Sequence, residues 1–270
     1  MHQTGQRNSA RPELSLPVTV VLQEGKAIHL VSCPLVSAFY FVLLRGLRIV
    51  LLGLAMAQGG CWEGITRNAL ATVLSTEGTT VIRPSGRGQS SPLLPGAHPG
   101  GGAIIQTSAS SRAALEILPN ILLQLDHDTG IEIVRIAVTK DGNETGNDMR
   151  ARHAAVRLLA GHAFVSHVWG EASSGFTVVT PHGELVTNSN SLYCLESDEH
   201  KTRVTCVTGT VRFQPSDGSA AMAIRGGFLA EWPSPTPGLI AAETDARAQE
   251  DLQETLDAER NLRRLISKNP

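Results

Sequence analysis

Serine and histidine residues that could hydrolyse a bond are present, but their spacing does not fit a catalytic arrangement. The segment 170–175 (GEASSG) lacks the G-x-S-x-G spacing that holds a nucleophilic serine on a sharp turn. The segment 98–102 (HPGGG) is similar to an oxyanion loop, yet no nucleophile accompanies it. We therefore predict no catalytic residue, and we expect that the chain is not an enzyme.

Potential metal ligands are also scattered. Residues 126–128 (DHD) are consecutive, and neighbours on a strand point to opposite faces, so they cannot readily converge on one ion. His162 and His167 lie five residues apart in an expected strand and fail for the same reason. The loop 141–152 begins like a calcium loop, but Arg152 stands where a glutamate is required. The sequence predicts no metal ligand and no cofactor.

Cys194 and Cys206 are the one pair with a geometrical argument. Both are equally distant from His200, so they face each other if the chain forms a hairpin that turns about this residue. A cross-strand disulfide is then geometrically feasible in an oxidising compartment. The alternative is that both are small apolar residues on the core face, and the sequence leaves the two interpretations open.

Composition favours an all-β domain. The 270 residues include 26 glycines and 14 prolines, which suit a chain that turns often between short strands, and 41% are hydrophobic, enough for an ordinary core. The net charge of -2 provides no basic surface for nucleic acid, so we expect no nucleic-acid partner.

The stretch from 155 to 213 carries a repeated pattern. VRLLAGHAFV (156–165) and VTCVTGTVRF (204–213) align with Gly161 and Gly209 in register. Between them lies FTVVTPHGELV, which is two β-prone runs around Pro181 and Gly183. This punctuation predicts strand, turn, strand, repeated.

The TPHG motif (Thr180, Pro181, His182, Gly183), followed by the strand and turn at 202–209, resembles the bacterial FecR domain. The glycine-rich loop and strands up to residue 136 are also similar to this family, so that the resemblance covers 69–232. It implies an all-β fold, either a β-solenoid or a sandwich of short strands, located outside the cytoplasmic membrane. Turns are expected at Thr180, Pro181 and Gly183, and at Gly161 and Gly209. The best-known family members relay a signal from an outer-membrane receptor to a sigma factor.

The chain divides into segments of different composition. We predict a leader or signal/anchor segment at 1–57, a linker at 58–68, a FecR-like β domain at 69–232, a proline-rich linker at 233–238 and an amphipathic helical tail at 239–270. Arginines, an apolar run and then Ala55-Met56-Ala57 have the layout of a cleavable export signal. Alternatively, residues 35–57 form a membrane tether. Either hypothesis places the protein in the periplasm or outside the cell.

The helical tail carries an apolar stripe that includes Leu252, Leu256 and Leu262. Such a stripe must be buried, either on the same domain or through self-association. From the motifs and the resemblance to the FecR domain, we expect a non-enzymatic, exported FecR-domain protein. It would bind an envelope protein or polymer, with a possible role in envelope signalling. The alternatives are a stiff structural surface component and an undetected hydrolase.

Overall fold

The computed structural model describes residues 65–85, 88–140, 149–169, 173–234 and 238–268. By its internal contacts the chain separates into units 1–60 and 61–270, and the description below concerns the second unit. The predicted leader and tether, and the loop at 141–148, lie outside the described residues. No helix among the described residues has the length and apolar composition needed to cross a bilayer.

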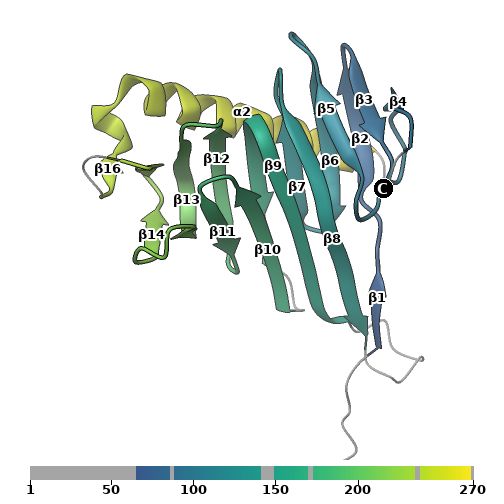
Figure 1. Ribbon diagram of the computed structural model, residues 1–270, viewed down its shortest axis with the longest axis horizontal. Coiled ribbons are helices and arrows are strands. Elements are labelled where there is room, and N and C mark those ends of the chain that lie inside the picture. Colours follow the sequence, from purple (N-terminus) through teal and green to yellow (C-terminus); the bar gives the residue numbers. More distant parts are fainter. Residues whose placement is uncertain (1–64, 86–87, 141–148, 170–172, 235–237, 269–270) are drawn as a thin grey trace, which may run out of the picture. The chain divides into compact units, whose positions relative to one another are not determined.

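The prediction of an all-β fold with one C-terminal helix is confirmed (Figure 1). The strands are β1 (Ile65–Asn68), β2 (Thr72–Glu77), β3 (Thr80–Arg83), β4 (Ser91–Pro92), β5 (Ile104–Thr107), β6 (Arg112–Leu118), β7 (Ile121–Leu125), β8 (Gly130–Lys140), β9 (Met149–His167), β10 (Ser173–Thr180), β11 (Gly183–Thr187), β12 (Ser191–Ser197), β13 (Thr202–Pro215), β14 (Met222–Arg225), β15 (Phe228–Trp232) and β16 (Ile240–Ala241). A short 3-10 helix (Ala242–Thr244) leads into α2 (Ala246–Lys268).

The strands form two layers, which we call sheet I and sheet II. Sheet I contains the whole of β1, β3, β4, β5, β8, β10, β11 and β14. It also contains the first part of β9 and the second part of β13. Sheet II contains β2, β6, β7, the second part of β9, β12, the first part of β13, β15 and β16. All ladders are antiparallel except that of β9 with β10. Of the two architectures left open, this is the sandwich.

Two glycines mark the places where a strand passes from one sheet to the other. Gly161 lies inside β9 with φ +103°, and Gly209 lies inside β13 with φ +79°. The turns predicted at these glycines are therefore wrong, because each copy of the repeat is one long strand bent at its glycine. A bend of this kind makes the corner of a sandwich. The chain does turn between Thr180 and Gly183, where β10 ends and β11 begins.

The core fills the space between the two sheets. Strand alternation turns isoleucine, leucine and valine side chains of both sheets toward this space. Its largest fully buried side chains include Tyr193, Phe176 and Phe213. The Tyr193 hydroxyl accepts a hydrogen bond from Thr187 Oγ1 at 3.2 Å, which satisfies its one buried polar atom.

Helix α2 covers the outer face of sheet II, so the molecule has a third layer (Figure 1). The helix consists of strong helix formers, and the Asp245 carboxylate caps it by accepting a hydrogen bond from the Ala248 N–H at 2.8 Å. Leu262 packs against Leu74, Ala114 and Leu122 of sheet II. Leu262 is thus buried on the domain that carries it and Leu252 is partly buried there, whereas Leu256 is exposed.

Candidate functional site

Polar and ionisable groups gather where α2 lies on sheet II. Arg203, on β13, reaches across to the helix and is 7% exposed. Its guanidinium donates to Glu231 Oε1 at 3.0 Å and to Asp245 Oδ1 at 2.6 Å. Burial works against the charge of Arg203, but these carboxylates outweigh it and raise the pKa of the guanidinium. The ion pairs tie the first turn of α2 to the sheet.

Asp251 is the most deeply buried carboxylate of the helix, at 3% exposure. Its Oδ2 accepts a hydrogen bond from Thr205 Oγ1 at 3.0 Å, and Arg203 Nε lies 3.6 Å from the same oxygen. Arg247 Nε lies 3.3 Å from Oδ1, although Oδ1 has no hydrogen-bond partner among the described residues. One oxygen of this buried carboxylate is therefore left without a hydrogen bond.

His162 lies on the same face of sheet II. Its Nδ1 is 3.9 Å from Asp126 Oδ2, and Asp126 Oδ1 accepts a hydrogen bond from Arg112 Nε at 2.8 Å. Burial alone lowers the pKa of His162, but its contacts with Asp126 and Cys194 raise it to about 10. For Asp126 burial raises the pKa, yet the nearby His162 ring and the hydrogen bond from Arg112 hold it well below its usual range.

One ligand atom from each of His162, Cys194 and Asp251 lies within 4.8 Å of the other two, and all three residues are buried. In the sequence, the potential metal ligand nearest to His162 is His167, five residues away. The structure keeps those two histidines apart but brings His162 partners from β12 and α2. These three residues could hold a metal ion. They are far apart in the sequence, so no local spacing of ligands predicts that they come together.

Cys194 and Cys206 are both free, so the disulfide, one of the two interpretations that the sequence leaves open, is not formed. A turn centred on His200 would pair Cys194 with Cys206. The hairpin instead pairs Ser197 with Thr202 and Cys194 with Thr205, a register that differs by one residue. A shift of one residue moves a side chain to the other face of its sheet. Cys206 consequently lies in the core between the sheets, whereas Cys194 faces the helix.

His167 and Ser174 form a buried pair that is similar to a base and a nucleophile. His167 Nε2 and Ser174 Oγ are 3.0 Å apart, and both residues are buried. Burial lowers the pKa of His167, and no ion pair links its ring to a carboxylate in the described part of the chain. The arrangement lacks both access for a substrate and an acid that would orient the base. The hydrogen bond is structural.

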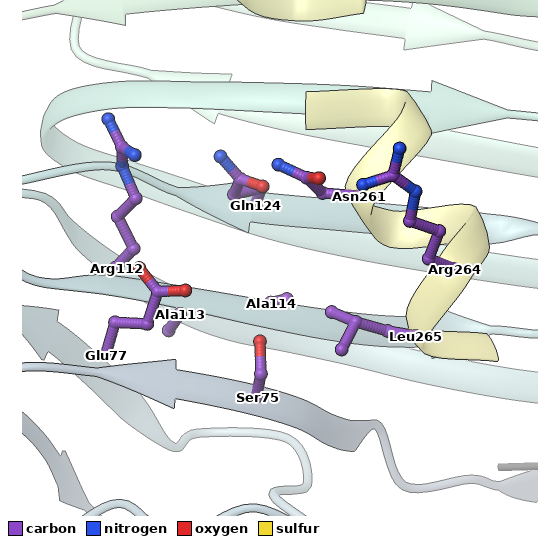
Figure 2. A pocket seen from close by; sticks show the side chains of 9 residues that line it. All are labelled: Ser75, Glu77, Arg112, Ala113, Ala114, Gln124, Asn261, Arg264 and Leu265. Atoms are coloured by element: carbon purple, nitrogen blue, oxygen red, sulfur yellow. The ribbon is translucent and has the colours of Figure 1, made fainter. Parts of the chain in front are cut away.

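A pocket of about 310 Å³ lies beside the C-terminal half of α2 (Figure 2). Arg112 and Glu77 stand at one end, and Arg264 and Asn261 extend from the helix at the other. The floor between them consists of residues from β2, β6 and β7 that include Ser75, Ala113, Ala114 and Gln124. Positive, negative and amide groups therefore face a single polar hollow.

The fold and this interface define the class of protein: an all-β sandwich whose polar groups join a helix to a sheet. Residues 103–212 match the family model described as FecR protein, the family that the sequence motifs resemble. No curated protein matches the chain.

Two crystal structures of one protein from Parabacteroides distasonis, described as a candidate anti-sigma factor, are similar to this chain. Each shares 14% identity at a TM-score of 0.37, and the match covers 51% of this chain and 57% of theirs. The chain thus spans just over half of the length of that protein.

Proposed function

We propose that this is an exported, non-enzymatic FecR-domain protein that acts in envelope signalling by binding another envelope protein. The observation that carries the proposal is the FecR match over 103–212. The same segment supplies β6 and β7, which form part of the floor of the pocket in Figure 2. Two strands of the matched segment thus form part of a polar hollow beside α2.

The chemistry of the pocket favours a polypeptide partner over a charged polymer. Arg264 has no ion-pair partner among the described residues, whereas Arg112 is held by Asp126. Glu77 shares the pocket with both arginines and would repel a uniformly anionic chain. Guanidinium, carboxylate and amide groups side by side match the mixed donors and acceptors of a protein surface.

Site-specific photo-crosslinking in the producing cell tests the binding. A crosslinking residue at Asn261 is expected to capture one envelope protein, while the same residue at Arg225, on sheet I, captures none. Charge reversal by Arg264→Glu should weaken capture at Asn261, and Arg225→Glu should not. Capture of a polysaccharide or lipid polymer in place of a protein, or equal capture at both positions, would overturn the proposal.

Export is tested separately. Cell fractionation should place the protein in the periplasm or outside the cell. Mass spectrometry of the native N-terminus should show cleavage after Ala57 or an intact tether at 35–57. Recovery of the bulk of the protein in the cytoplasm would refute export without bearing on the pocket.

A further inference from the structure

Three side chains from three separate elements converge under the N-terminal half of α2. His162 comes from β9, Cys194 from β12 and Asp251 from the helix. The imidazole, the thiol and the carboxylate each present one ligand atom within 4.8 Å of the other two. They offer nitrogen, sulfur and oxygen, the ligand types that together suit a borderline-soft divalent cation such as Zn²⁺ and exclude Mg²⁺ and Ca²⁺.

The sheet itself creates this convergence. On the ladder between β9 and β12, Cys194 pairs with Phe164, and His162 pairs with Glu196 two residues along. Residues two apart on a strand share a face, so His162 and Cys194 are diagonal neighbours on the outer face of sheet II. Helix α2 packs on this face at Ala258 and brings Asp251, two turns earlier, toward both.

The unpartnered oxygen of Asp251 is an independent observation. Oδ2 is engaged by Thr205, but Oδ1 is buried with no hydrogen-bond partner in the described part of the molecule. The nearby Arg247 Nε, at 3.3 Å, does not make a hydrogen bond to it. A buried carboxylate oxygen without a hydrogen bond is costly, and coordination to a cation removes that cost.

The structure assigns a transition-metal site of the Zn²⁺ class to His162, Cys194 and Asp251, with water as the fourth ligand of a tetrahedral ion. Asp126 lies on the Nδ1 side of the His162 ring, which leaves Nε2 as the ligand and gives the histidine the carboxylate support common in zinc sites. On binding, the Cys194 thiol and the protonated His162 ring each release one proton to solvent, and the two groups coordinate as the thiolate and the neutral imidazole.

The charges around the site are compatible with a divalent ion. The thiolate and the Asp251 carboxylate neutralise its two charges. Arg203 lies beside Oδ2 of Asp251, whereas the ion binds Oδ1 in place of Arg247, whose half-exposed side chain also pairs with Glu250. The ion is bonded to residues of β9, β12 and α2 at once, so it stabilises the packing of α2 on sheet II.

Titration with Co²⁺ tests the assignment, because a cobalt–thiolate bond has a charge-transfer absorption that no oxygen or nitrogen ligand produces. The full chain is used in a Cys33→Ser/Cys61→Ser background, so that the two cysteines of the sandwich are the only thiols left. We expect one Co²⁺ per chain and a thiolate band that Zn²⁺ displaces. Cys206, buried in the other face of β13, provides the matched control.

Cys194→Ser should abolish the band, and Cys206→Ser should leave it unchanged. Asp251→Asn, an isosteric change that keeps the helix packing, should weaken Co²⁺ binding by at least tenfold. Zn²⁺ should also raise the melting temperature of the parent chain but not that of Cys194→Ser, and Mg²⁺ should raise neither. A missing thiolate band, or a band that depends on Cys206, would overturn the site. Either result leaves the proposed signalling function untouched.

Discussion

The corner at Gly209 leads to a prediction that two alanine substitutions can isolate. Gly209 and Gly218 have nearly the same backbone conformation, with φ +79° and +81°. A side chain in this left-handed region costs about 1–2 kcal/mol for any L-residue. Their surroundings differ, because a Cβ on Gly218 meets nothing within 4 Å, whereas a Cβ on Gly209 lies 2.0 Å from Asn190 O and 2.9 Å from Ser191 Cα.

The two atoms that crowd Gly209 belong to the backbone at the start of β12, so no side-chain rotation can relieve the clash. The ladder that pairs Ser191 with Gly209 must shift, and overpacking of this kind costs about 1–3 kcal/mol. We therefore expect Gly218→Ala to lower the free energy of unfolding by about 1–2 kcal/mol and Gly209→Ala by about 2–5 kcal/mol.

Urea unfolding followed by circular dichroism measures both losses, provided that the m-value stays the same. Gly161→Ala should behave like Gly209→Ala, since its Cβ would lie 2.5 Å from Thr129 Cα. Equal losses for Gly209→Ala and Gly218→Ala would refute the reasoning. The strand would then not pass the corner as closely as the structure shows.

Three further predictions concern the helix and a buried histidine. Arg203→Met should cost about 3 kcal/mol of unfolding free energy, because it removes the guanidinium that pairs with the buried Asp251 and with the half-buried Glu231 and Asp245. Arg260→Met, at an exposed ion pair, should cost below about 1 kcal/mol by urea unfolding. Leu262→Ala should cost about 2–4 kcal/mol, because Leu262 is buried, and Leu256→Ala should cost below about 1 kcal/mol in the same assay, because Leu256 is 39% exposed. Equal losses would contradict the docked position of α2. Burial lowers the pKa of His167, so the folded state favours the neutral ring. The contribution of this ring to stability is fully present above about pH 6.5 and is lost as the pH falls below that value. His167→Gln should reduce this loss in melting curves recorded from pH 7 to 5.

Strand content could be predicted from the sequence because alternation and glycine punctuation are local signals. What these signals do not specify is whether a glycine between two β-prone runs ends a strand or bends it. At Thr180 to Gly183 a proline follows the first run, and the chain turns. At Gly161 and Gly209 no proline or polar cluster interrupts the runs, and the strand continues through the corner. The absence of these residues is the signal that distinguishes the two cases.

The site could not be predicted because its members are far apart in the chain and its geometry depends on one register. The hairpin of β12 and β13 has an irregularity between Leu192 and Tyr193, and its strands meet at Ser197 and Thr202. A pairing one residue different would put both cysteines on one face. The register that forms sends Cys194 to the helix instead, and sequence patterns carry no information on a shift of this size.

The polar groups under α2 explain why the helix adopts one position on sheet II. Its apolar contacts, through residues such as Ala258 and Leu262, have no directional requirement of their own. Ion pairs are more demanding, because Arg203 must meet Asp245 and Asp251 together, and a shift of one turn would leave a buried guanidinium without its carboxylates. Hydrophobic burial therefore holds the helix on the sheet, and the buried charges select its register.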